Sequence, residues 1–223
     1  MVACECLVFR NVMKKQSTIV YIHGGMTFST ERKYVQYLRR RPVSLTKKEK
    51  WSGAYLEVRI GKRFHLLRLR MPLVDNAKYR DWALHFERYL PHLGNDAILI
   101  GESLGGIFLA KYLSEHRLRA PARAIYLVCP PFDNTLPREE LVGGFVLPKN
   151  LTLLQRNTRI LRFLFSRKDD VVPVTQARKY AKKLPHADIR ILPHIKGHFD
   201  VAQLPELVKL IRRDTTPRRK LGK

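Results

Sequence analysis

Short segments dominated by apolar residues recur along the chain, and longer segments with helical spacing separate them. The clearest apolar segments lie at 17–23, 97–100, 124–129 and 159–165. A strand with little polar face is buried on both sides, which is typical of a parallel sheet covered by helices. This alternation predicts an α/β fold with a mainly parallel sheet and helices on both of its faces.

The other expected elements continue the same alternation. Two further strands are expected at 64–69 and 188–192. Helices are expected at 30–40, 46–60, 76–93, 104–116, 175–184 and 204–213. A chain of 223 residues is long enough to build one core, so we expect a single domain over residues 17–213. Residues 1–16 are expected to form a leader or an extra strand, and residues 214–223 a disordered basic tail.

The strongest feature of the composition is its basic charge. The chain has 43 Lys and Arg residues against 19 Asp and Glu residues, a formal net charge of +24. Such an excess attracts phosphate backbones and other polyanions. No aromatic interleaving or nucleic-acid-binding motif accompanies the charge. We therefore interpret it mainly as a property of the surface, with non-specific nucleic-acid contact as the less favoured alternative.

The cysteines and the hydropathy pattern restrict the setting of the protein. Cys4, Cys6 and Cys129 are too few and too irregularly spaced for a disulfide framework or a zinc site. Cys129 ends an apolar segment and is expected to be a small buried hydrophobe. No apolar run is long enough to span a bilayer. These features predict a cytoplasmic protein with no membrane partner, and they leave its oligomeric state open.

The pattern G-x-S-x-G occurs once at a strand end. Residues Gly101 to Gly105 directly follow the apolar segment 97–100 and directly precede a predicted helix. This strand–turn–helix setting is what a nucleophile elbow requires, because the turn presents the serine while its glycines leave room for neighbouring backbone. The helix amides that follow point at any oxyanion formed there. Ser103 is therefore a candidate nucleophile; the alternative is an ordinary serine in a glycine-rich turn.

A serine hydroxyl needs a base, and the base needs a group that orients it. Asp169 and Asp170 follow the strand that ends at 165, whereas His194 and His198 follow the next strand. An acid and then a histidine, on consecutive strands after the serine, is the order expected for this chemistry. Asp169 and His198 are favoured, with Asp170 and His194 as competitors. A metal site in the pair His194 and His198 is not favoured, because Gly197 argues against a helix and no third ligand is evident.

The developing oxyanion requires two backbone N–H groups close to the serine. Leu104, the residue after the candidate nucleophile, is expected to supply one. The loop after the first strand is expected to supply the other, from the amide of Gly25 or Met26. His23 and Gly24 in the same loop are expected to border the substrate, with His23 bracing the loop through hydrogen bonds.

Glu102 precedes the candidate nucleophile and is also expected to border the substrate. A carboxylate at this position disfavours anionic substrates or raises the pKa of His198 if it faces the site. If it turns away, it pairs with one of the many arginines. We favour the arginine pairing.

Together these motifs resemble the small single-domain α/β-hydrolases of the retinoblastoma-binding protein 9 type, a family of serine esterases. The resemblance covers about residues 18–213. It is carried by His23-Gly24-Gly25, by the elbow around Ser103, by Asp169 through Pro173, by Gly197-His198-Phe199 and by the segment from Pro130 to Pro148.

The resemblance implies an α/β-hydrolase fold over 17–213 with a short lid at 131–149, and a Ser-His-Asp triad that needs no cofactor and no metal. The family pattern of an acid three residues before Val172 selects Asp169, and the Gly-His-Phe pattern selects His198. The expected activity is hydrolysis of small carboxylic esters through an acyl-enzyme. The alternatives are an acyltransferase or thioesterase with the same triad, and a non-catalytic binding protein with a basic surface.

Overall fold

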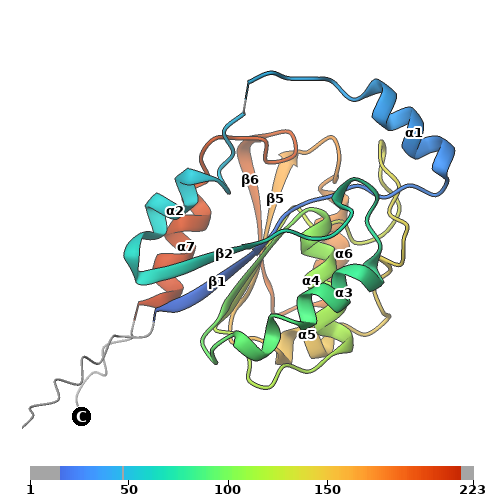
Figure 1. The fold of residues 1–223 in the computed structure, drawn as a ribbon. Coiled ribbons are helices and arrows are strands. Elements are labelled where there is room, and N and C mark those ends of the chain that lie inside the picture. The colour runs from blue at the N-terminus through green and yellow to red at the C-terminus, as the bar shows by residue number, and fades with distance from the viewer. Residues whose placement is uncertain (1–15, 47, 217–223) are drawn as a thin grey trace, which may run out of the picture.

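The computed structural model describes residues 16–46 and 48–216, and its centre is a six-stranded sheet (Figure 1). The strands are β1 (Ser17–Ile22), β2 (Phe64–Leu69), β3 (Ile98–Glu102), β4 (Ala124–Val128), β5 (Leu161–Lys168) and β6 (Asp188–Lys196). They lie in the order β2-β1-β3-β4-β5-β6, and every neighbouring pair is parallel. The predicted parallel sheet is confirmed.

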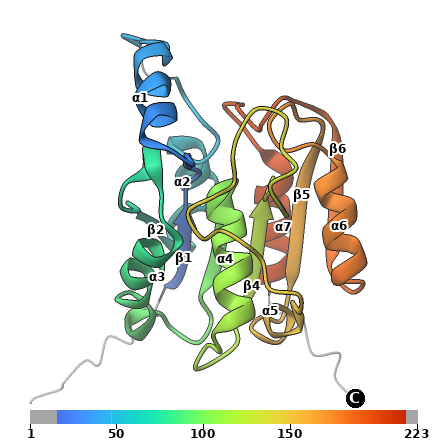
Figure 2. The same cartoon turned by 90° about the vertical axis from the view of Figure 1, so that its right-hand side faces the viewer.

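Helices cover both faces of this sheet (Figures 1 and 2). Helices α2 (Ala54–Ile60) and α7 (Pro205–Thr215) pack on one face. Helices α3 (Tyr79–Glu87), α4 (Leu104–Glu115), α5 (Thr152–Arg156) and α6 (Thr175–Lys183) cover the other face. Helix α1 (Glu31–Arg40) buries none of its residues and stands at the upper end of the molecule in Figure 2. Among the described residues, every helix is too short or too polar to cross a membrane.

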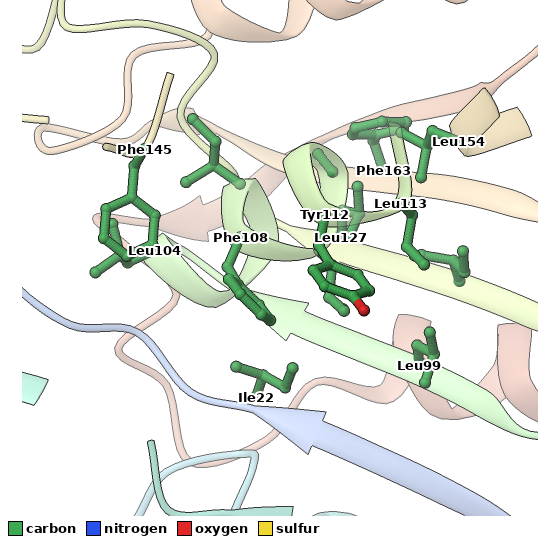
Figure 3. Close-up of a cluster of buried hydrophobic side chains, with 14 of the residues drawn as sticks. Ile22, Leu99, Leu104, Phe108, Tyr112, Leu113, Leu127, Phe145, Leu154 and Phe163 are labelled. Carbon is green, nitrogen blue, oxygen red and sulfur yellow. The ribbon is translucent and has the colours of Figure 1, made fainter. Parts of the chain in front are cut away.

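The central strands and α4 form the best-buried part of the core. Every residue of β3 and of β4 is buried, which explains why neither strand has a polar face. Phe108 of α4 packs its ring against Trp82 and Phe86, and also against Tyr112 of the same helix (Figure 3). Fully burying one such side chain stabilises the fold by about 1.5–3 kcal/mol. The turn at Ser103 therefore joins a fully buried strand to a largely buried helix.

The register of the central strands aligns their carboxyl ends. Ile22 of β1 pairs with Gly101 of β3, and Glu102 pairs with Val128 of β4. Parallel strands in register end at one edge of the sheet, so the loops that follow them meet there. This edge is where the sequence places its candidate site residues.

Several predicted boundaries are wrong. The helix expected at 46–60 covers only 54–60, because the N–H of Gly53 closes a turn onto Lys50 and the N–H of Trp51 bonds to Val201. The helix expected at 76–93 ends at Glu87, and a separate 3-10 turn at 90–92 contains Pro91. Helix α5 was not predicted, and β6 continues through Pro193 to Lys196.

The chain ends of the domain also differ from expectation. Helix α7 continues through Asp214 to Thr215, so these two residues are helical and do not belong to a disordered tail. Thr215 is buried, and its hydroxyl donates to the carbonyl of Ile211. The predictions for residues 1–15 and 217–223 lie outside the described residues.

Candidate active site

Ser103 lies in a sharp turn between β3 and α4. Its backbone has φ 51° and ψ −118°, a conformation that is strained for a residue with a side chain. The turn is held in place because the Ser103 N–H donates to the carbonyl of Val128 at 2.8 Å. A Cβ on Gly101 would lie 2.5 Å from the carbonyl oxygen of Gly105, and one on Gly105 would lie 2.6 Å from the carbonyl oxygen of His23. Both glycines are thus required by close backbone contacts.

Asp169 and His198 lie in the loops that follow β5 and β6. The left-handed Gly197 (φ 66°) joins the two loops, since its N–H donates to the carbonyl of Lys168 at 3.0 Å. His198 Nε2 lies 2.8 Å from Ser103 Oγ, and His198 Nδ1 lies 2.8 Å from Asp169 Oδ2. The fold thus brings together the three side chains that sequence analysis favoured.

Asp169 is held more firmly than its competitor Asp170. The Asp169 carboxylate is fully buried and accepts the backbone N–H groups of Val171 (2.9 Å) and Val172 (2.8 Å) as well as the imidazole. Asp170 instead points outward and pairs with Arg138 at 2.6 Å. The acid that touches the histidine is therefore Asp169.

The competing histidine has its own partner. His194 lies within β6, is half exposed, and its Nε2 is 2.8 Å from the carboxylate of Glu206 on α7. His198 bonds to Ser103 and Asp169 instead. The two imidazoles therefore do not share a site.

Sequence analysis missed the role of Cys129, which contacts the catalytic candidates. Its Sγ lies 3.8 Å from His198 Nε2, and its backbone is left-handed (φ 43°). Burial raises the pKa of the Cys129 thiol, so the sulfur is neutral near neutral pH. The signal was available: Cys129 is the last residue of the predicted strand 124–129, at the edge of the sheet where the other candidates lie.

Burial and hydrogen bonding act on His198 in opposite directions. Burial disfavours the imidazolium, whereas the Cys129 sulfur and the Asp169 carboxylate favour it, and the pKa of His198 rises well above the ordinary value of 6.5.

Ligand atoms of Cys129, Asp169 and His198 lie within 4.8 Å of one another, the spacing of a metal site. Asp169 and His198 already bond to each other, so a metal would have to use the Nε2 atom that now faces Ser103.

The loop after β1 lies directly against the elbow. A Cβ on Gly24 would lie 3.2 Å from the Cβ of Ser103, and one on Gly25 would lie 3.1 Å from Leu104. The N–H of Met26 donates to the carbonyl of Val74 at 2.9 Å, so it is already used. Within the described residues the N–H of Gly25 has no such acceptor. Of the two expected donors in this loop, Gly25 is the one left free.

His23 braces this loop. The N–H of Met71 donates to its Nε2 at 3.1 Å, so Nδ1 carries the proton and donates to the carbonyl of Gly24 at 2.6 Å. Both ring nitrogens are occupied, as the bracing role requires. His23 and Gly24 also line the cleft beside Ser103.

The expected partner of Glu102 is wrong. Its buried carboxylate accepts the hydroxyl of Tyr21 on the adjacent strand β1, and no arginine among the described residues contacts it. Burial and this carboxylate raise the pKa of Tyr21, which therefore stays protonated as the donor. Sequence analysis missed the pairing because strand order, which places β1 beside β3, is not visible in the spacing.

A cleft of about 660 Å³ opens beside Ser103 and His198. The loop after β1, the segment 48–55 and Ala202 form its walls, and Glu139 from segment 131–149 faces the same space. Figure 2 shows this segment looping beside α4 at the upper end of the sheet. Segment 131–149 is tied down at Phe132, whose N–H donates to Gln176 at 2.7 Å, and at Gly143, whose carbonyl accepts from Tyr79 at 2.9 Å.

The chain is similar to a known protein family. A family model described as serine hydrolase matches residues 48–212. No curated protein matches the sequence significantly.

Solved structures share the fold. The ydeN gene product from B. subtilis has a TM-score of 0.72 at 20% identity, covering 89% of this chain and 98% of that one. A YdeN-like hydrolase from Pectobacterium atrosepticum has a TM-score of 0.58 at 17% identity, covering 89% and 91%. Est1E from Butyrivibrio proteoclasticus has a TM-score of 0.57 at 12% identity, covering 91% and 88%. At these identities the similarity shows the fold, which is that of the α/β-hydrolases.

Proposed function

Because the chain belongs to the serine hydrolase family, we propose that Ser103 is its nucleophile and that it cleaves carboxylic esters through an acyl-enzyme. The observation that carries this proposal is the continuous hydrogen-bond chain from Ser103 Oγ through His198 to Asp169. A serine hydroxyl is a poor nucleophile until a base removes its proton as it attacks. The 2.8 Å contact to Nε2 places such a base within reach.

In the first half of the reaction, Ser103 Oγ attacks the ester carbonyl carbon and its proton moves to His198 Nε2. Asp169 accepts the Nδ1–H and stabilises the imidazolium that forms. The backbone N–H groups of Leu104 and Gly25 donate to the carbonyl oxygen as it becomes an oxyanion. His198 then returns the proton to the departing alcohol, which leaves the acyl group on Ser103.

In the second half, His198 removes a proton from water, and the hydroxide attacks the acyl carbonyl carbon. Collapse of the second tetrahedral intermediate returns the proton to Ser103 Oγ and releases the carboxylic acid. Each atom of the triad thus returns to its starting state. An alcohol or amine in place of this water would make the same site an acyltransferase, and we propose hydrolysis as its reaction.

Segment 131–149 is proposed as the lid of this site. Glu139, Leu136 and Leu141 of the segment line a small hollow that also contains Ser103 and Leu104. The cleft of about 660 Å³ suits small or extended acyl groups.

A panel of chromogenic esters of increasing acyl length tests the proposal. The wild-type protein is expected to release nitrophenol from the short esters, and Ser103→Ala to reduce kcat by about a thousandfold or more. Ser114→Ala is a matched control, because the Ser114 hydroxyl only donates to the carbonyl of Ala110 within α4. Equal rates for Ser103→Ala and wild type, with both proteins folded, would overturn the assignment.

A further inference from the structure

Glu139 is fixed in the cleft by the two residues beside it. Arg138 pairs outward with Asp170 at 2.6 Å. Glu140 accepts the N–H of Ser29 at 3.0 Å and pairs with Lys33. These contacts fasten the segment on either side of Glu139, whose side chain lines both the cleft and the small hollow beside Ser103.

The positive side chains of the cleft already have acceptors. Lys48 and Lys50 both face the carboxylate of Asp200. Arg68 pairs with Glu57 at 2.9 Å and donates to the backbone carbonyls of residues 52 and 53. Three cations of the cleft thus face two carboxylates, which leaves one positive charge, on the exposed lysines, without an acid of its own.

The negative side chains of the cleft differ from one another. Glu102 accepts the Tyr21 hydroxyl, and Glu49 is exposed to solvent. Glu139 is half-buried, and within the described residues no hydrogen-bond donor or cation contacts its carboxylate. Burial raises the pKa of Glu139, and the attraction of the nearby His198 offsets this only in part, so the charged form has lost more solvation than its surroundings return.

We propose that Glu139 forms a cation subsite in this cleft and that the preferred esters carry an ammonium or similar cationic group. This proposal rests on the proposed function, whose nucleophile lies in the same cleft. A cationic substrate group would replace the solvation that Glu139 lacks, and the low local dielectric would strengthen the contact. The repulsion of such a substrate by Lys48 and Lys50 is weakened by Asp200 and, because both lysines are exposed, by solvent.

Two esters of equal shape test the subsite. The p-nitrophenyl ester of 4-(trimethylammonio)butyrate differs from that of 5,5-dimethylhexanoate only by a cationic nitrogen in place of a neutral carbon. We expect wild-type protein to favour the cationic ester by about tenfold in kcat/KM, mainly through KM, as one charge contact allows. Glu139→Gln is expected to bring the ratio of the two esters close to one, and Glu139→Lys to reverse it.

Glu31→Gln is the matched control, because it removes the same charge from the exposed first turn of α1, away from the cleft. It is expected to keep the wild-type ratio. A ratio near one in wild type, or an equal fall in the ratio for Glu31→Gln and Glu139→Gln, would overturn the subsite while leaving the proposed ester hydrolysis intact.

A binding measurement tests the cation subsite independently of ester cleavage. Ser103→Ala protein is titrated with 4-(trimethylammonio)butyramide and with its neutral isostere 5,5-dimethylhexanamide, neither of which requires the nucleophile. Tighter binding of the cationic amide, lost when Glu139→Gln is added, supports the subsite even if no ester is cleaved. Equal binding of the two amides overturns it.

Discussion

At the scale of single residues, the proposed role of His198 as the base predicts how the activity depends on pH. Its imidazole acts as a base only when it is neutral, so protonation removes activity. The pKa of His198 is raised from 6.5 by Cys129 and Asp169, and because the Cys129 thiol is protonated near neutral pH, the Asp169 carboxylate is the negative charge that remains. We expect kcat/KM for a neutral ester to rise with pH through a midpoint above 6.5. A midpoint at or below 6.5 would contradict this assignment of charges.

Substitutions at the adjacent residues Asp169 and Asp170 test which carboxylate orients His198. Asp169→Asn removes the charge that stabilises the imidazolium and disturbs the histidine tautomer, so we expect kcat to fall by about a thousandfold or more. The midpoint of the pH profile should also move down. Asp170→Asn loses only an exposed pair with Arg138, and its effect should be much smaller. Equal losses of kcat in the two variants, measured on the same ester, would contradict the assignment of Asp169 as the orienting acid.

The sequence predicts residues that act through local geometry better than those that act across strands. Ser103 was predictable because its glycines, strand and helix are neighbours in the chain. Glu102 was not, because its Tyr21 partner depends on β1 lying beside β3. Glu139 was missed for the same reason: nothing near it in the sequence indicates that it lines the cleft.

At the scale of elements, a buried ion pair attaches the last helix to the sheet. Asp214 of α7 accepts Arg162 of β5 through both carboxylate oxygens, at 2.6 and 2.7 Å, and the hydroxyl of Tyr126 of β4 at 2.8 Å. Its side chain is only 3% exposed. Helix α7 therefore does not end before this residue, although the sequence around it reads as the start of a polar tail.

Removing the charge of Asp214 should destabilise the domain. Asp214→Asn leaves Arg162 buried and incompletely paired, and we expect the free energy of unfolding to fall by about 3 kcal/mol. Asp75→Asn, which breaks the half-exposed pair with Arg41, should cost less than about 1 kcal/mol. Denaturant unfolding of both variants measures the difference, and equal costs would contradict the buried pairing.

The same pair has a defined pH dependence. Burial alone would raise the pKa of Asp214, but hydrogen bonds from Arg162 and Tyr126 outweigh it and lower the pKa below 3.8. The pair therefore stabilises the fold above the unfolded-state pKa, and this contribution is lost as pH falls through the lower folded-state value. Asp214→Asn should accordingly flatten the acid side of the stability profile.

Element types were predicted more reliably than element ends. The apolar strands β3 and β4 were evident because both faces are buried. The helix at 46–60 was overestimated because Trp51 is buried at a helical spacing from Tyr55 yet belongs to a turn. Strand β6 passes through Pro193, which is tolerated at an edge strand that pairs on one side only.

At the scale of the whole molecule, the net charge of the chain does not describe the charges in the cleft. The net charge of +24 is spread along the sequence, whereas the cations of the cleft pair with Asp200 and Glu57, and Glu139 is half-buried with no ion pair among the described residues. The candidate site itself exists only in the fold, since Ser103 and His198 are 95 positions apart and Asp169 and His198 are 29 apart. Three loops at one edge of a parallel sheet bring them into contact.

The most direct test is covalent labelling by a fluorophosphonate, which reacts with a serine activated by its neighbours. The native protein is expected to carry one adduct, located by mass spectrometry on the peptide that contains Ser103. The urea-unfolded chain and native His198→Ala should carry almost none, because in both the serine lacks its base. Native, folded protein that shows no adduct on Ser103, or that labels as well without His198, would contradict the account.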